Sequence, residues 1–256
     1  MDLARRTAIK VPEITAVFWI TKLLTTAMGE ATADFFVLRY NKFLAVAVSG
    51  VLLAVALAIQ LVATRYVPGM YWLAVAMVAV FGTMAADALH IQLKVPYTAS
   101  TIFFAVVLAV VFIVWHRFER TLSIHSVFTL RRELFYWAAV LATFALGTAA
   151  GDLTANTMGL GYFASALVFM AMILLPAVGY RGFKMNAILA FWTAYVLTRP
   201  IGASFADWFG KAKVKSGLGW GDGWVALVLT ALIIGFVVYI TVSHEEDPRE
   251  EAGPQP

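Results

Sequence analysis

Residues 71–87 read YWLAVAMVAVFGTMAAD: nine residues separate the tryptophan from a glycine, and four separate that glycine from an aspartate. The same spacing recurs in FWITKLLTTAMGEATAD (18–34), YWAAVLATFALGTAAGD (136–152) and FWTAYVLTRPIGASFAD (191–207). An aromatic residue precedes the tryptophan in every copy. Four occurrences of so specific a spacing indicate a tandem repeat.

Each copy lies within an apolar run. Of the 256 residues, 62% are hydrophobic and 13% are charged, against about 25% charged in ordinary soluble domains. Runs of about 20 apolar residues predict membrane-spanning helices. The sequence therefore predicts an all-α polytopic membrane protein and excludes a water-soluble enzyme. Eight transmembrane helices are expected, over roughly residues 14–38, 43–64, 70–92, 98–116, 134–157, 161–180, 185–209 and 222–243.

The repeat defines the domain organisation. One transmembrane domain is expected over residues 1–243, with repeats at about 12–66, 67–118, 130–182 and 185–243 in two pseudo-symmetric halves. The copies occupy odd-numbered helices, which cross in the same direction, so the repeats are parallel. Short connections predict that the two helices of each hairpin pack against each other. Residues 244–256 (HEEDPREEAGPQP) are expected to be a disordered acidic tail.

The basic residues outside the spans predict the orientation. Six lie on one side: Arg39, Lys42, Lys94, Lys211, Lys213 and Lys215. Eleven lie on the other: Arg5, Arg6, Lys10, Arg65, Arg117, Arg120, Arg131, Arg132, Arg181, Lys184 and Arg249. Because cytoplasmic loops carry the excess of Lys and Arg, both termini are expected in the cytoplasm of a bacterial inner-membrane protein.

Four tandem repeats of two spans, each with a signature tryptophan, resemble an uncharacterised family of bacterial membrane proteins built from such repeats. The resemblance covers about residues 12 to 243. It implies the architecture of that family and brings no activity with it, so the functional residues are inferred from the sequence itself.

Each repeat residue has an expected role. The tryptophan lies about 22 Å along the helix from the aspartate, at the depth of the cytoplasmic interface, and is expected to be an anchor or packing residue. The glycine is expected to mark close helix packing, because small residues let membrane helices approach.

The repeated aspartates are the candidate site. An unpaired carboxylate within a span costs several kcal/mol, so such residues face the bundle interior or a wet cavity. Quasi-equivalent helices would bring Asp34, Asp87, Asp152 and Asp207 to one depth, as a ring of oxygens for a hard cation or for protons. The alternative is that each aspartate is structural.

Two further positions extend this site. The residue four before each aspartate shares its helix face and is Glu30, Thr83, Thr148 or Ala203. Glu30 is therefore an additional expected ion ligand, and Thr148 an additional lining residue. His90 follows Asp87 by three residues and is the expected nitrogen ligand of a transition metal.

Two bases also lie within spans, Lys22 and Arg199, and are expected to pair with intramembrane acids as counter-charges. Pro200 is expected to kink or break its helix. Five acids within the spans against these two bases leave a charge of −3, which favours a bound cation or protonated carboxyls.

These residues predict a secondary transporter or exporter of a small cation, with a divalent metal favoured and proton coupling. The expected partners are the cation, protons and membrane lipid, without nucleic acid; a homo-oligomer is left open. No cofactor is expected beyond a bound divalent cation, and no catalytic motif is present, so the protein is not expected to be an enzyme. The alternative is a non-transporting sensor or assembly subunit with structural aspartates.

Overall fold

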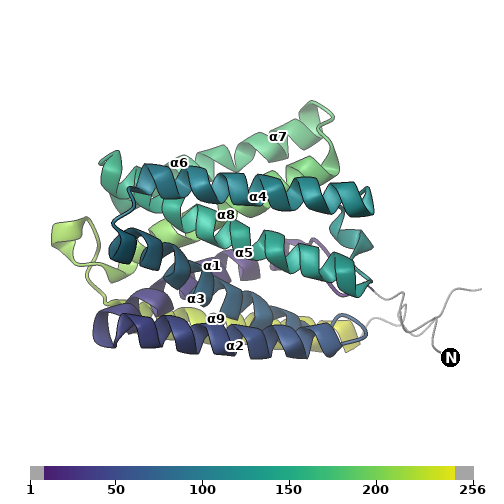
Figure 1. Cartoon of the computed structure of the whole chain (residues 1–256), viewed down its shortest axis with the longest axis horizontal. Coiled ribbons are helices and arrows are strands. Elements are labelled where there is room, and N and C mark those ends of the chain that lie inside the picture. Colours follow the sequence, from purple (N-terminus) through teal and green to yellow (C-terminus); the bar gives the residue numbers. More distant parts are fainter. Residues whose placement is uncertain (1–8, 246–256) are drawn as a thin grey trace, which may run out of the picture.

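The computed structural model describes residues 9–245, without the side chains of residues 89, 91–93, 244 and 245 (Figure 1). In that range all regular structure is helical, which confirms the all-α part of the expected fold class. The helices are α1 (Ala16–Arg39), α2 (Lys42–Val62), α3 (Pro68–Leu93), α4 (Tyr97–Glu119), α5 (Leu130–Asp152), α6 (Gly161–Met172), α7 (Leu174–Gly182), α8 (Ala187–Gly210) and α9 (Asp222–Glu245). Residues 244 and 245 end α9, and the rest of the expected tail lies outside the described residues.

Two prolines act differently in their helices. Pro176 lies in the first turn of α7, and a helix continuous with α6 would force its ring against the carbonyl of Met172. The expected span at 161–180 is therefore divided at Ile173. The break expected at Pro200 is wrong, because α8 continues through it. Close packing of α5, whose Gly147 lies against Pro200, supports the helix there.

Among the described residues, six helical segments are long and apolar enough to cross a membrane: α2, α3, α4, α5 with the π-helical turn that follows it, α6 with α7, and α9. The helices α1 and α8 have comparable length but are more polar. They carry Lys22, Glu30, Asp34, Arg199 and Asp207. These residues lie largely inside the protein, which explains how two polar helices are accommodated.

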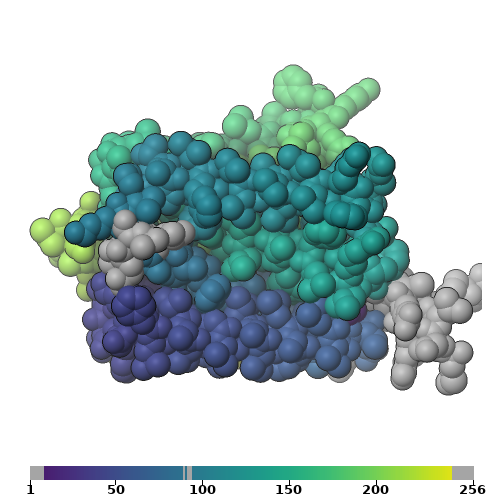
Figure 2. All heavy atoms as spheres, viewed as in Figure 1, coloured from purple at the N-terminus to yellow at the C-terminus, as the bar shows by residue number. Residues whose placement is uncertain are grey.

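The helices that carry the repeat signature form an inner bundle. Helix α1 contacts α3, α3 contacts α5, α5 contacts α8, and α8 contacts α1. In Figure 1 this bundle lies between α2 and α9 on one side and α4, α6 and α7 on the other. On the face drawn in Figure 2, α2 and α4 form the two outer bands, and their exposed side chains include Phe43, Val51, Ile102 and Ile113.

Each outer helix packs mainly on the inner helix of the following repeat. Helix α2 packs on α3, α4 on α5, α6 on α8, and α9 on α1, with few contacts inside each hairpin. The expectation that hairpin partners pack together is therefore wrong. Packed helix axes are about 8–10 Å apart, so even a short loop reaches either neighbour. Because each outer helix packs on the next repeat and α9 packs on α1, the four repeats form a closed ring.

The repeat glycines lie at the inner contacts, which confirms their expected role. Each approaches the residue three before the glycine of the next repeat. A Cβ on Gly82 would lie 2.9 Å from the Cβ of Phe144, and one on Gly202 would lie 2.7 Å from the Cβ of Thr26. The other two glycines, Gly29 and Gly147, meet Ala79 and Arg199 in the same way.

Aromatic side chains make the matching contacts at the other end of the inner bundle. The aromatic residue before each tryptophan contacts the tryptophan of the next repeat. The pairs are Phe18–Trp72, Tyr71–Trp137, Tyr136–Trp192 and Phe191–Trp19. Equivalent residues meet at both ends, so the inner helices run in the same direction.

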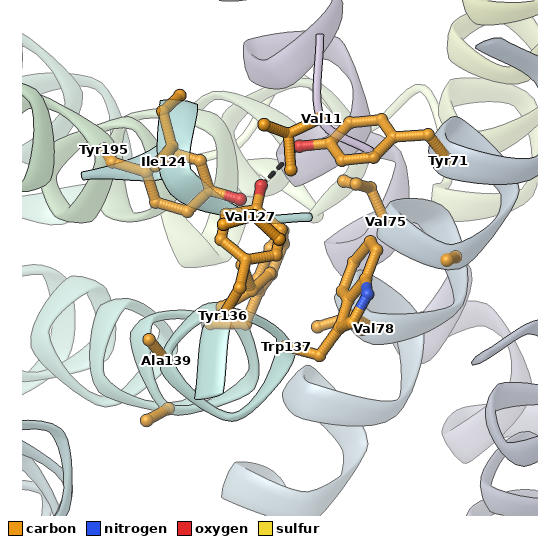
Figure 3. Close-up of a cluster of buried hydrophobic side chains, with 14 of the residues drawn as sticks. Val11, Tyr71, Val75, Val78, Ile124, Val127, Tyr136, Trp137, Ala139 and Tyr195 are labelled. Carbon is orange, nitrogen blue, oxygen red and sulfur yellow. Dashed lines mark hydrogen bonds between the residues drawn. The ribbon is translucent and has the colours of Figure 1, made fainter. Parts of the chain in front are cut away.

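The tryptophans therefore pack in the core: Trp72, Trp137 and Trp192 are buried, and Trp19 is partly buried. Tyr71 and Tyr136 share a hydrogen bond between their hydroxyl groups (Figure 3). These residues pack with one another rather than acting as exposed interfacial anchors.

A buried ion pair holds the N-terminal segment against this end of the bundle. Lys10 Nζ donates to Glu133 Oε2 at 2.7 Å and to the Leu61 carbonyl at 3.2 Å. Gln60 Nε2 donates to the other carboxylate oxygen of Glu133 at 3.1 Å. The pair ties residues before α1 to the end of α2 and the start of α5.

Candidate functional site

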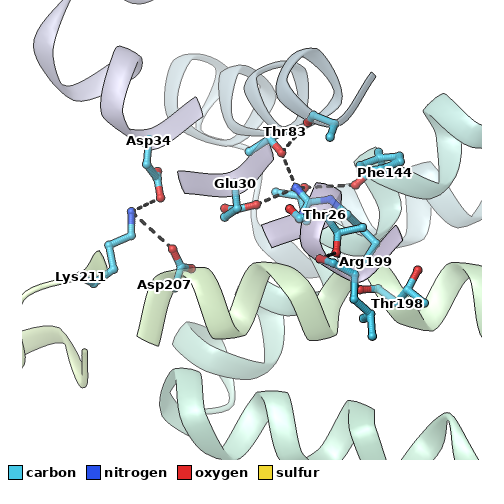
Figure 4. Close-up of polar contacts among 12 residues, drawn as sticks. Thr26, Glu30, Asp34, Thr83, Phe144, Thr198, Arg199, Asp207 and Lys211 are labelled. Carbon is cyan, nitrogen blue, oxygen red and sulfur yellow. Dashed lines mark hydrogen bonds and ion pairs between the residues drawn. The ribbon is translucent and has the colours of Figure 1, made fainter. Parts of the chain in front are cut away.

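Arg199 lies at the centre of the inner bundle and is completely buried. Its Nη2 donates to Glu30 Oε2 at 2.6 Å, to Thr148 Oγ1 at 2.7 Å, and to Thr83 Oγ1 (Figure 4). Its Nη1 donates to the carbonyl of Thr26 at 3.3 Å. The expected pairing of Arg199 with an intramembrane acid is confirmed.

The three side chains on Arg199 occupy the same position in successive repeats, four residues before the aspartate. The fourth equivalent residue, Ala203, belongs to α8 itself and has no polar group. Thr83 and Thr148 each donate their hydroxyl proton to a carbonyl one turn earlier in their own helix. Their oxygens are thereby free to accept from the guanidinium group. One equivalent position in each of three repeats therefore accepts a hydrogen bond from the guanidinium group of Arg199.

Three carboxylates gather about one turn further along. Glu30, Asp34 and Asp207 each offer an oxygen atom that lies within 4.8 Å of the other two. Glu30 and Asp207 are buried and Asp34 is partly buried. Carboxylate oxygens at this separation are suited to a hard cation. Asp207 Oδ1 is buried and accepts no hydrogen bond from the described residues.

A lysine already occupies this group of acids. Lys211 Nζ forms an ion pair with Asp34 Oδ2 and lies 3.6 Å from Asp207 Oδ1 (Figure 4). Burial by itself lowers the pKa of Lys211, but the charges of Asp207 and Asp34 outweigh it and raise that pKa well above its ordinary value. Lys211 was expected to be a loop charge outside the bilayer. The sequence signal for this contact is the spacing of four residues between Asp207 and Lys211, which is typical of ion pairs on a helix.

The other two repeat aspartates lie apart from this group. Asp152 accepts a hydrogen bond from Asn156 Nδ2 at 3.2 Å, and Asn156 lies on the π-helical turn that follows α5 (Leu153–Thr157). Asp87 lines a small cavity of about 190 Å³ with Lys42 and Met84. Both interact electrostatically with Glu30 and Asp34. The structure thus brings two of the four expected aspartates into direct contact with one base.

The repeats match a known family model. The family described as Repeat of Unknown Function (DUF347) matches residues 17–66, 70–121, 135–184 and 190–245. The chain belongs to this family. The expected set of four tandem repeats is thereby confirmed. Neither a curated protein nor a solved structure matches the chain.

The four DUF347 repeats contribute unequally to the site. Repeat one supplies Glu30 and Asp34, and repeat four supplies Arg199, Asp207 and the Lys211 that follows α8. Repeats two and three supply hydroxyl groups on Arg199 and the two more distant aspartates. The carboxylate group therefore forms where the last repeat closes on the first.

His90, in the second DUF347 repeat, does not join the carboxylates among the described residues. Its Nδ1 lies 2.7 Å from the carbonyl oxygen of Val95, and its ring stacks on Tyr97 with 3.5 Å between the ring centres. These contacts give His90 a local role at the loop between α3 and α4.

Lys22, in the first DUF347 repeat, is buried without a carboxylate. Its Nζ lies 3.8 Å from the centre of the Phe144 ring and 4.2 Å from that of Tyr195. It makes no hydrogen bond to the described residues. The expected pairing of Lys22 with an acid is therefore wrong. Arg199 takes Glu30, and the two ring faces supply the attraction that Lys22 receives.

Replacing Lys22 by methionine should leave the free energy of unfolding unchanged or raise it by about 1 kcal/mol. Methionine keeps most of the length of the side chain and removes an ammonium group whose burial is costly. Unfolding in detergent micelles, with the exposed Lys213→Met as control, measures the effect. A loss above about 2 kcal/mol would show that the two rings more than offset the cost of burying the charge.

Proposed function

We propose that this DUF347 protein is a secondary transporter of a small cation, with Glu30, Asp34 and Asp207 as the binding site. The observation that carries the proposal is the approach of three carboxylate oxygens to within 4.8 Å inside a helical bundle. Acids within a membrane protein are costly, and they line ion and proton pathways where they occur together.

The charge around the site supports a cation. Glu30, Asp34, Asp87, Asp152 and Asp207 interact electrostatically with one another. Against these five acids stand two bases in direct contact, Arg199 and Lys211. With these two bases the formal charge of the group is −3, and it is −2 when the buried Lys22 is also counted. Part of this charge requires neutralisation by bound cations or protons.

The ring of contacts supports the finer architecture. Helices α1 and α8 would cross the bilayer inside the shell of more apolar helices, which gives eight spans. The contacts of equivalent residues around the ring favour a pseudo-fourfold axis. Each of the two expected halves would then consist of two of the four repeats related by this axis. Such an axis places the site between repeats one and four, beside the axis rather than on it.

The distribution of basic residues still supports the orientation expected from the sequence. Lys10 and Lys211 are engaged in ion pairs, and setting both aside leaves ten basic residues against five. Both termini would then be cytoplasmic in a bacterial inner membrane, and the carboxylates would lie near the opposite surface. The cation would reach them from outside the cell.

Transport by reconstituted protein tests this function. Asp34→Asn and Asp207→Asn should each lower Mn²⁺ or proton flux into vesicles by at least about tenfold, because each removes a charged ligand. Glu13→Gln, an acid-to-amide change at an exposed position, should transport like the unaltered protein. Wild-type flux in both aspartate variants would refute the site assignment.

One observation favours the alternative of a non-transporting sensor or assembly subunit. Each of the three carboxylates already has a basic neighbour, Arg199 for Glu30 and Lys211 for the two aspartates. On that reading the group is a structural ion-pair network. Asp34→Asn would then lower stability or assembly, and the unaltered protein would bind no cation.

A further inference from the structure

Lys211 differs from the other basic residues of its loop. It follows the last residue of α8 directly, and its side chain is 16% exposed while it contacts Asp34 and Asp207. Lys213 and Lys215, two and four residues on, are exposed. A single lysine of this loop therefore turns inward, to the place where three carboxylates converge.

The backbone of Lys211 is held in place by two hydrogen bonds, while its ammonium group contacts Asp34 and Asp207. Its N–H donates to the carbonyl of Asp207 at 2.8 Å, and its carbonyl accepts from the N–H of Gly219 at 2.8 Å. Four flexible methylene groups separate this backbone from Nζ. The ammonium can therefore leave the aspartates for water without any rearrangement of the helices.

We propose that Lys211 is a tethered competitor for the cation site, and that a divalent cation displaces it from Asp34 and Asp207. This inference rests on the proposed function and names its substrate class and its regulation. Asp207 supports it, because its Oδ1 accepts no hydrogen bond from the described residues although the side chain is only 8% exposed. That oxygen has an ammonium group at 3.6 Å and is available to a closer ligand.

Charge explains the preference for a divalent ion. Arg199 neutralises Glu30, while Lys211 leaves one uncompensated negative charge on Asp34 and Asp207. A monovalent ion in the place of Lys211 would leave the same charge. A divalent ion removes it, and neutrality is favoured for a group so little exposed to water. The carboxylate of Asp222 lies against Gly210, the residue before Lys211, and would be an alternative partner for the displaced ammonium.

Binding of Mn²⁺ to purified protein in detergent tests the proposal. Lys211→Met should bind Mn²⁺ at least about tenfold tighter than the unaltered protein, because a competing charge is gone. Lys211→Arg keeps the competing charge and should bind like the unaltered protein, as should the loop control Lys213→Met. Addition of Na⁺ at the same ionic strength should displace little Mn²⁺.

The outcomes separate the two proposals. Equal affinity in Lys211→Met and the unaltered protein, with binding lost in Asp207→Asn, overturns the competitor role and keeps the site. Weaker binding in a folded Lys211→Met likewise overturns it, and folding is checked by its elution as a single species. Absence of Mn²⁺ binding in the unaltered protein and in Lys211→Met overturns both proposals.

Discussion

Replacing Arg199 by methionine should lower the free energy of unfolding by about 3–5 kcal/mol, because it leaves a buried carboxylate without a partner. Glu30 is 5% exposed and receives its charged hydrogen bond from Arg199 at 2.6 Å. The same change removes the donor to Thr83 and Thr148 and to the carbonyl of Thr26. Four groups from three helices lose their common partner.

A double variant separates the cost of an orphaned charge from loss of packing. Arg199→Met combined with Glu30→Gln removes both charges and should recover more than half of the loss, since neutral replacements of a buried pair are often tolerated. Reversible unfolding in mixed micelles measures all three variants. A double variant as unstable as Arg199→Met alone would show that the pair is not the main contribution.

Replacing Gly202 by alanine should destabilise the protein by about 1–3 kcal/mol, the usual cost of overpacking a core. The added Cβ would lie 2.7 Å from the Cβ of Thr26 and 2.9 Å from the backbone nitrogen of Ala27. Neither atom is the free end of a flexible side chain. Helices α8 and α1 would have to separate, and this contact also aligns Arg199 with Glu30.

Gly235→Ala is the matched control. Gly235 lies in α9, and a Cβ there would meet nothing within 4 Å. Alanine favours a helix over glycine by up to about 1 kcal/mol, so this variant should be equally or more stable. The same unfolding measurement applies to both. A Gly202→Ala protein as stable as Gly235→Ala would contradict the close contact around the ring.

The sequence predicts the helices and the role of the repeat because both depend on local pattern. Apolar runs define the helices, and spacing identifies the glycines as contacts. Arg199 could be assigned an acidic partner because a base so deep in an apolar helix requires one. The sequence leaves this partner open between Glu30 and one of the repeat aspartates, and the structure shows Glu30.

The sequence does not predict which of several similar helices or side chains becomes the partner of a given residue. An outer helix has two inner helices within reach, and no residue pattern indicates that it packs on the next repeat. Lys22 has acids on its own helix, yet the rings of Phe144 and Tyr195 surround it. Lys211 follows the end of a helix, and its spacing from Asp207 indicates the contact with that residue, but only the folded loop shows that it also reaches Asp34. The repeat likewise predicts a similar depth for the four aspartates, but it does not predict that Asp34 and Asp207 are the two that lie together.

The closure of α9 on α1 has a consequence for biogenesis. Helix α1 is synthesised before α8 and α9, which cover it on two sides. Glu30 and Asp34 therefore lack their basic partners Arg199 and Lys211 until the fourth repeat has been made. Acids without counter-charge are costly within a bilayer, so synthesis of the last repeat completes both the packing and the charge balance of the first.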